Sequence, residues 1–120
     1  MEKLLKIPYT VFNDDWDLLQ QFLDRRGNPR YELVGDVNLS YRDDLFDLGN
    51  LVLVNGHLLL NETPIESIGN LEYVNGGLDI YNTPLQSLET LKYVAETIYL
   101  SRNYQIPDEQ LTRFKFKIFY

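Results

Sequence analysis

The chain contains no cysteine, one histidine and one tryptophan in 120 residues. The absence of cysteine excludes disulfides and thiolate metal sites, and it fits a reducing compartment. No apolar run approaches the ~20 residues of a membrane-spanning helix. The apolar start of the chain is interrupted by Lys6 and Pro8, so it does not resemble a signal peptide. We therefore expect a cytoplasmic protein that does not contact a membrane.

Positive charge is scarce in the middle of the chain. Residues 31–101 contain eleven Asp or Glu but only Arg42 and Lys92 as basic residues, and the whole chain carries a net charge of −7. An acidic surface repels phosphate backbones, which argues against direct binding of nucleic acid, and it attracts a protein with a basic surface. The same carboxylates also keep a small protein soluble, so a functional and a merely solubilising acidic surface both remain open.

A period of twenty residues runs through this acidic segment. The stretch "LGNLVLVNGHLLLNETPIES" at 48–67 is followed directly by "IGNLEYVNGGLDIYNTPLQS" at 68–87, and a third copy comes next. A weaker copy upstream places Val34 twenty residues before Val54 and supplies "VNLS" at 37–40. One copy cannot bury its own apolar side but stacked copies can, so a period of this length predicts a solenoid.

Each copy has the same internal plan. Leu58 and Leu60 lie two residues apart, which places both side chains on one face of a short strand. Ile68, Leu71 and Val74 are spaced by three, which predicts a helical or 3₁₀ turn on the opposite side of the coil. The Asn-Gly and Thr-Pro pairs between these segments predict its corners.

The pattern "L-x-L-x-x-T-P-[IL]-x-S-[IL]-x-x-L-x-x-V-x-G" spans residues 34 to about 101. It resembles the short leucine-rich-repeat-like proteins common in bacteriophage genomes. The resemblance implies parallel strands along one face and protein binding as the usual use. For a phage protein it implies a host protein as target, such as a defence nuclease, in the manner of an anti-CRISPR protein, or a transcription component. Thr-Pro stands where ordinary leucine-rich repeats have their N-x-L step, so we expect no asparagine ladder there.

We predict one domain over residues 1–120 with an α/β solenoid fold. It is expected to be a leucine-rich-repeat-like, right-handed coil with a parallel strand ladder and about four repeats of 20 residues at 34–103. An N-terminal cap at 1–33 and a C-terminal cap at 104–120 are expected to cover the apolar ends of the coil.

Each cap has one predicted element. The segment 14–26 is expected to be a helix, with Asn13 as its N-cap residue and Gly27 at its end. The tail "RFKFKIFY" at 113–120 alternates in polarity, which predicts a strand that closes the C-terminal edge. The same strand can instead pair with a second copy, so a homodimer remains open.

Catalytic chemistry has little support in the sequence. His57 is the only histidine, and no Ser nucleophile has a recognisable partner. Asp43, Asp44 and Asp47 cluster in one turn without calcium-loop spacing. We therefore predict a protein that is not an enzyme and uses no cofactor and no metal.

Residues between the buried pairs point outward from the strands. Tyrosine supplies large contact area at low entropic cost and is enriched in interfaces, although it is also common in strands for reasons of packing. Four short strands present only ~300 Å², whereas a stable interface takes about 800 Å² per partner. Either the caps join the contact, or the protein dimerises, or the binding is weak. We predict a partner-binding surface made of Asp36, Asn38, His57, Leu59, Asp79, Tyr81 and Tyr99, with Arg102 and Tyr104 at its rim.

The function that fits these features is a non-catalytic protein–protein interaction module. Two alternatives remain open. An acidic mimic of nucleic acid requires carboxylates spaced on one face like phosphates. A structural, self-assembling unit would use the strand expected at 113–120.

Overall fold

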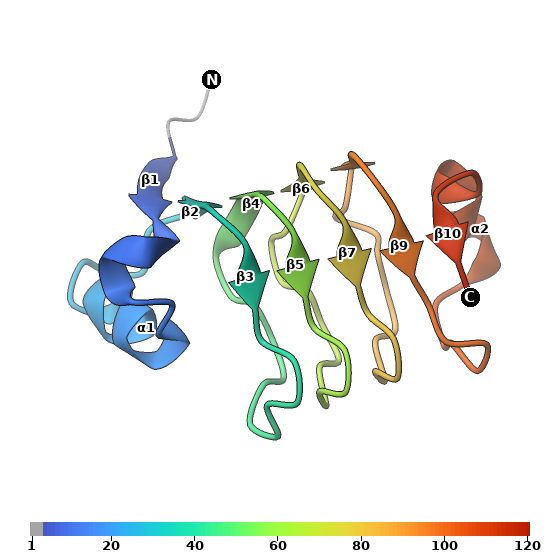
Figure 1. Ribbon diagram of the computed structural model, residues 1–120, viewed down its shortest axis with the longest axis horizontal. Helices are drawn as coiled ribbons and strands as arrows, with labels where there is room; N and C mark the ends of the chain where they lie inside the picture. Colours follow the sequence, from blue (N-terminus) through green and yellow to red (C-terminus); the bar gives the residue numbers. More distant parts are fainter. Residues whose placement is uncertain (1–3) are drawn as a thin grey trace.

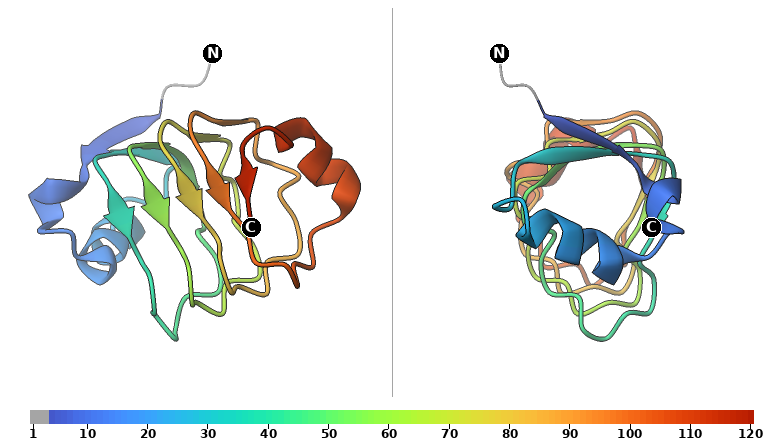
Figure 2. Two further views of the ribbon diagram at one scale, coloured as in Figure 1. Left: turned by 45° about the vertical axis from the view of Figure 1, so that its right-hand side comes forward. Right: turned by 90° about the vertical axis from the view of Figure 1, so that its left-hand side faces the viewer.

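The computed structural model describes residues 4–120, so the first three residues of the predicted N-terminal cap lie outside it. The chain forms a β-solenoid of about four turns, and its strands pair in parallel. Figure 1 shows the turns in sequence order, and Figure 2 shows them stacked along the solenoid. Within the described residues, no helix is long and apolar enough to cross a membrane.

Two five-stranded sheets run along the solenoid, and each complete turn contributes one strand to each sheet. In the first sheet the order is β1 (Leu5–Pro8), β2 (Tyr31–Val34), β4 (Leu51–Asn55), β6 (Tyr73–Val74) and β8 (Tyr93–Val94). In the second sheet the order is β3 (Val37–Asn38), β5 (Leu58–Leu59), β7 (Leu78–Asp79), β9 (Ile98–Tyr99) and β10 (Ile118–Phe119).

The first sheet differs from the sequence prediction. Ile68, Leu71 and Val74, expected in a helical turn, are divided between a non-helical turn and a strand. The Leu71 N–H donates to the Ile68 carbonyl at 3.2 Å, and Val74 lies in β6. Three apolar residues spaced by three do not distinguish a helical turn from a turn that leads into a strand. In the described part of the chain, helices occur only near the two ends.

Columns of apolar side chains fill the interior between the sheets. Leu58, Leu78 and Ile98 pair in register and are fully buried, as the period predicts. The buried cluster extends from Ile7 to Phe114, so one core runs through the described chain. Because each turn alone exposes its apolar side, the stack of turns stabilises the fold.

The upstream copy differs from its predicted alignment in the first sheet only, since Val37 stands at the strand position expected for it. Leu33, rather than Val34, pairs with Val54, and Val37 pairs with Leu58. Both pairs are separated by twenty-one residues, so the first complete turn is one residue longer than the later ones. The expected match of two valines was therefore wrong, because the extra residue moves Val34 out of the buried column.

Successive turns approach closely at the corner between the sheets. A Cβ atom added at Gly56 would lie 2.5 Å from the carbonyl oxygen of Gly35, and one added at Gly76 would lie 2.5 Å from that of Gly56. Such distances are too short for any side chain. Glycine is therefore required at positions 56 and 76, whereas the last turn has Glu96 at the equivalent position.

Asparagine side chains also join the turns, although at other positions than the Thr-Pro step. Asn75 Nδ2 donates to Asn55 Oδ1 at 2.6 Å, and Asn70 Nδ2 donates to Asn50 Oδ1 at 2.8 Å. Each pair is separated by twenty residues, so the same side chain recurs at the same place in adjacent turns. These bonds satisfy amide groups at the corners while keeping the turns in register.

Two helical elements lie at the N-terminal end, η1 (Tyr9–Phe12) and α1 (Trp16–Asp24). Seen from that end, α1 lies across the stacked turns (Figure 2). Trp16, Leu19 and Leu23 on one side of α1 are buried in the core cluster. The helical spacing places Phe22 on the same side as these three residues, and Phe22 is only partly buried.

Helix α1 is shorter than the helix predicted over 14–26. Asn13 is not its N-cap residue, because the Asp15 carboxylate accepts a hydrogen bond from the Leu18 N–H at 3.0 Å. Asn13 and Asp14 have φ of 54° and 56°, which is incompatible with a right-handed helix and delays its start. The expected N-cap chemistry is present two residues later along the chain.

After the last turn, the chain forms α2 (Asp108–Leu111) and η2 (Thr112–Phe114) before it enters β10. Leu111 and Phe114 lie three residues apart and are both buried, as expected for one side of a helical segment. The strand predicted over 113–120 is therefore wrong for most of its length, and only its last part pairs with β9. Phe116, expected on the buried side of that strand, is 92% exposed.

Basic side chains of this C-terminal segment bond the last turn of the first sheet. Lys117 Nζ donates to the Val94 carbonyl at 2.5 Å. Arg113 donates to the carbonyls of Leu91 and Leu88 at 2.8 and 2.9 Å. These donors occupy the edge at β8, where a further turn would otherwise place its backbone N–H groups.

Candidate functional site

One row of outward-pointing side chains crosses the second sheet. The strand register places Asn38, Leu59, Asp79 and Tyr99 side by side, and β10 adds Phe119 beyond Tyr99. We call these five residues the ladder face. Its first four members were predicted from the sequence, whereas Phe119 was not. Phe119 follows Tyr99 by twenty residues, so continuing the period through the tail would have identified it.

On one flank of the ladder face, side chains bond the turns to one another. The Asp36 carboxylate accepts a hydrogen bond from the His57 N–H at 2.9 Å. The Nδ1 atom of His57 in turn accepts one from the Gly77 N–H at 2.8 Å. Both predicted site residues therefore hold the backbone of the next turn, and Nδ1 of the histidine is already occupied.

On the other flank, Tyr81 is 45% exposed and lies in the turn that follows β7. The Tyr81 N–H donates to Asp79 Oδ1 at 3.0 Å, which fixes the carboxylate against the backbone. Next to it, Asn82 Nδ2 donates to Glu62 Oε1 at 2.8 Å. The two carboxylates thus lie on the same side of the second sheet.

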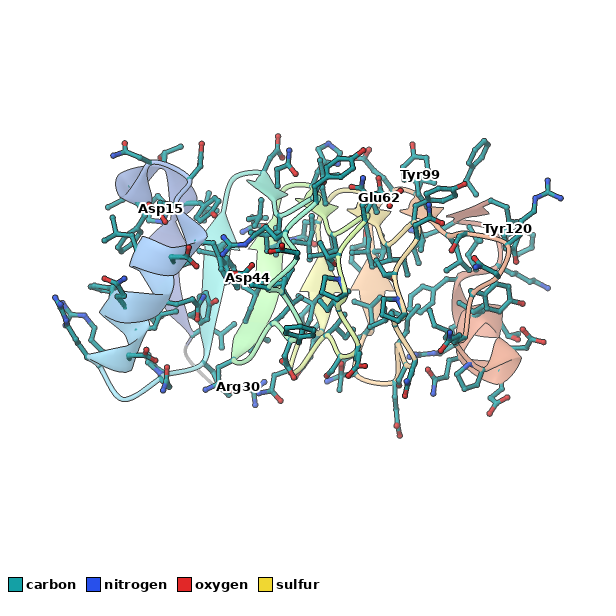
Figure 3. All side chains as sticks on the ribbon, turned by 90° about the horizontal axis from the view of Figure 1, so that it is seen from below. Asp15, Arg30, Asp44, Glu62, Tyr99 and Tyr120 are labelled. Carbon is teal, nitrogen blue, oxygen red and sulfur yellow. The ribbon has the colours of Figure 1, made fainter. Side chains whose placement is uncertain are left out.

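Aromatic rings gather at the C-terminal end of the ladder face. Tyr99 and Phe119 meet edge to face with ring centroids 5.8 Å apart, and Tyr104 and Tyr120 lie 6.2 Å apart. Tyr99 is 44% exposed and Phe119 is 63% exposed. Figure 3 shows Tyr99 and Tyr120 on one side of the molecule and Arg30 on the opposite side. Large apolar side chains exposed in one place are typical of contact surfaces.

Asp79 is electrostatically unusual among the ladder-face residues. Partial burial raises the pKa of its carboxyl, and the nearby Glu62 carboxylate raises it further. The hydrogen bond from the Tyr81 N–H opposes both effects by stabilising the charged form. A partly desolvated carboxylate in the middle of a strand row is costly unless a cation neutralises it.

The two predicted rim residues differ in their surroundings. Arg102 is exposed. The hydroxyl of Tyr104 donates to Asp108 Oδ1 at 2.6 Å, and this hydrogen bond raises the pKa of Tyr104 to about 12. Tyr104 also packs against the core cluster. It therefore contributes the edge of its ring to the surface, while its hydroxyl is tied to the C-terminal segment.

The opposite face of the solenoid is mixed in charge. Glu72 accepts from Arg30 at 2.9 Å and pairs with Lys92 at 3.0 Å, and these cations lower the pKa of its carboxyl. Tyr93, 47% exposed, lies beneath the ammonium of Lys117 at 5.1 Å. Glu72 on this side is paired with cations of the same chain, in contrast to Asp79.

A separate groove of about 500 Å³ lies at the N-terminal end. It was not predicted from the sequence. Phe12 and Phe22 contact each other in it with ring centroids 5.2 Å apart. Its lining consists of Val11, Phe12, Leu18, Gln21, Phe22, Arg25 and Arg26.

The ladder face offers exposed aromatic rings and a carboxylate for contact with a ligand. Within the described residues there is no group of three or more His, Asp or Glu that could hold a metal ion. Of the acidic turn, Asp44 pairs with Arg42 at 3.1 Å and Asp47 accepts from the Gly49 N–H at 2.6 Å. No protein-family model matches the chain, and neither a curated protein nor a solved structure is similar to it.

Proposed function

We propose that the chain is a non-catalytic protein–protein interaction module that binds its partner through the ladder face. The observation that carries the proposal is the row of strand positions ending in Tyr99 and Phe119, which are 44% and 63% exposed. Solvated sheet faces of small proteins are usually polar, whereas Tyr and Phe are enriched where two proteins meet. The aromatic end is the expected centre of the contact.

The contact area requires more than the strand row. Five short strands present about 400 Å², which is half of the area that one side of a stable interface buries. Tyr81, Tyr104 and Tyr120 border the row and enlarge the surface toward the C-terminal end. The partner therefore covers the last two turns and the C-terminal segment as well as the strands.

The charge of the chain favours a partner with a basic surface. The net charge is −7, and residues 31–101 account for the excess of carboxylates. The resemblance to short leucine-rich-repeat-like phage proteins favours a host protein as that partner, with the complex in the host cytoplasm. Binding would then modulate or inhibit the host protein, as expected for an inhibitor of a defence nuclease or of a transcription component.

The end segments support this surface in the proposed function. Helix α1 buries Trp16, Leu19 and Leu23, and the C-terminal segment buries Leu111 and Phe114. We assign both segments to capping, since each covers apolar side chains at one end of the stack. The C-terminal cap also carries β10, so it contributes directly to the contact surface.

A matched pair of tyrosine variants tests the proposal. Tyr99→Ala removes a ring that is 44% exposed on the ladder face, and Tyr93→Ala removes one that is 47% exposed on the opposite sheet. We expect wild type and Tyr93→Ala, immobilised and exposed to a lysate of the cell that expresses the gene, to capture the same protein. Tyr99→Ala should lose it. Equal capture by both variants would show that the ladder face is not the contact surface.

The positions of the carboxylates favour this function over a mimic of nucleic acid. Asp79 and Glu62 lie beside the second sheet, Asp44 lies in the acidic turn, and Glu72 is paired on the opposite face. A mimic would present carboxylates along one face like phosphates. For a self-assembling unit, the donation of Lys117 to β8 is unfavourable, because it occupies one edge through which copies would pair.

A further inference from the structure

We infer that the ladder face receives an arginine side chain of the partner, with the guanidinium paired to Asp79 and stacked against Tyr81 and Tyr99. The inference rests on the proposed function, because it assumes that the partner is a protein. It adds the chemistry of the central contact and the residues that make it.

Asp79 has the position that an ion pair across an interface requires. It lies in β7, with Leu59 of β5 on one side and Tyr99 of β9 on the other. One carboxylate oxygen accepts from the Tyr81 N–H at 3.0 Å, which leaves the other oxygen directed away from this bond. Among residues 4–120, no Lys or Arg forms an ion pair with it.

Glu72 has two neutralising cations close to its carboxylate, and Asp79 has no such ion pair among residues 4–120. Glu72 is partly buried on the opposite sheet, and Arg30 and Lys92 both neutralise it at 3.0 Å or less. Asp79 is also partly buried, but the charge that acts on it is the carboxylate of Glu62. A desolvated carboxylate beside a second carboxylate strongly favours a cation from outside the chain.

Two exposed tyrosines neighbour Asp79 along the chain and across the sheet. Tyr81 lies in the turn that follows β7 and bonds Asp79 through its N–H, and Tyr99 is the neighbour of Asp79 in the next strand. Both side chains are nearly half-exposed, and the ring of Tyr99 contacts that of Phe119, its neighbour in β10, whereas Asp79 neighbours Tyr99 in β7. A cation placed at the carboxylate therefore lies beside aromatic side chains, which adds a cation–π attraction to the charge pairing.

Arginine fits this site better than lysine. A guanidinium is planar and weakly hydrated, bonds a carboxylate through two N–H groups, and stacks flat on an aromatic ring. A lysine ammonium is strongly hydrated, and bringing it to a partly buried carboxylate removes more of its water. The combination of Asp79 with two rings therefore selects arginine.

Nuclear magnetic resonance with small probes tests the site directly. The probes are acetyl-Gly-Arg-Gly-amide and acetyl-Gly-Lys-Gly-amide, titrated into the full ¹⁵N-labelled chain at low salt. The arginine probe should shift the amides of Asp79, Tyr81 and Tyr99 in a saturable way, with an affinity at least about fivefold above that of the lysine probe. Asp79→Asn should weaken binding by about tenfold or more.

Asp79→Asn is suited to this test because an amide oxygen still accepts from the Tyr81 N–H, so the strand is preserved. Asp43→Asn, in the exposed acidic turn, makes the same change of charge and should leave the affinity unaltered. Shifts that are equal for both probes, or that persist in Asp79→Asn, would overturn the assignment. Capture that depends on Tyr99 would then still support the ladder face, so the two proposals fail separately.

Discussion

Residues that recur every twenty positions are constrained by the turn before them rather than by their own local structure. The glycine corner is the clearest example, because Gly76 meets the carbonyl oxygen of Gly56 where a side chain would begin. Gly27 differs, since it has open space around its α-carbon but a φ of +78°. Gly76 is therefore needed because a side chain has no space there, whereas Gly27 is needed because its backbone has a positive φ.

Gly76→Ala is expected to lower the free energy of unfolding by about 1–3 kcal/mol or more, because the turns must move apart to admit the methyl group. Gly27→Ala, where only the positive φ is unfavourable, should cost about 1 kcal/mol. Urea unfolding monitored by circular dichroism measures both. An equal or smaller effect at Gly76 would mean that the stack of turns is more pliable than this corner suggests.

Buried tyrosines make the stability sensitive to alkaline pH. Burial raises the pKa of Tyr9 and of Tyr31 to about 12 in the folded chain. A raised phenol pKa means that the folded state holds the proton more tightly, so the contribution to stability is complete below pH ~10 and is lost as the pH rises toward 12. Absorbance titration of the phenolates should show tyrosines ionising late. Tyr31→Phe should remove part of the alkaline loss of stability.

At the scale of the elements, the two sheets end differently at the C-terminal end of the solenoid. The first sheet stops at β8, whereas the second continues to β10. In the preceding turn the Val74 carbonyl accepts from the Ala95 N–H at 2.9 Å. The equivalent carbonyl of Val94 accepts from Lys117 Nζ instead. A side chain therefore takes the place of the backbone of a turn that is absent.

Lys117→Met is expected to destabilise the chain by about 1.5–3 kcal/mol, because the charged hydrogen bond to the Val94 carbonyl is lost. It should also increase self-association with concentration, since β8 then presents a free edge. Thermal unfolding and light scattering measure the two effects. Lys115→Met, in the same segment but without a hydrogen bond to β8 among the described residues, is the control. Similar losses in both variants would contradict a specific role for Lys117.

The sequence predicts the second sheet well and the first sheet poorly, for a physical reason. Leu58 and Leu60 alternate across a strand that is buried on one side only, which is a direct signal of a strand. Around β6 (Tyr73–Val74) the buried residues Leu71 and Val74 lie three apart, so the sequence there shows no alternation. Val74 continues the three-residue spacing of Ile68 and Leu71, so the sequence supports a helical turn as well as a strand here.

The ends of the chain depend on interactions that local patterns do not contain. Positive φ at Asp14 delays α1, and the spacing of Leu111 and Phe114 outweighs the alternation of the tail. In the candidate site, the row from Leu59 to Tyr99 follows from the period alone, and Asn38 follows from the alternation of Val37 and Leu39 around it. The bonds of His57 to adjacent turns do not, because they depend on the side-chain conformation at the corner.

At the scale of the whole molecule, the uneven charge is expected to steer a basic partner toward the chain. Its carboxylates are spread around the surface, but Asp79 lies in the second sheet, where the proposed contact forms, and Asp36 lies at the corner just before this sheet. Attraction between opposite net charges raises the association rate at low salt and is screened within ~10 Å at 0.1 M salt. The direction of approach is therefore tested by charge reversal on this sheet.

The double variant Asp36→Lys/Asp79→Lys should slow association with the captured partner and flatten its dependence on ionic strength. Asp43→Lys/Glu89→Lys changes the net charge equally at exposed positions elsewhere, so it should slow association less. Stopped-flow measurements over a series of salt concentrations compare the two. If both double variants slow association equally, the attraction depends on the total charge of the chain. If neither changes the rate, electrostatic steering does not contribute.

The side-chain donors of Arg113 and Lys117 also bear on how such a chain can change in length. They bond carbonyls that every turn presents at the same place, so they do not depend on how many turns precede them. Duplication of a whole twenty-residue unit ahead of the last turn would lengthen the rod by one rung, ~4.8 Å, and leave its terminus chemically unchanged. Recombination within the gene can therefore lengthen the binding surface while the same C-terminal segment still covers the last turn.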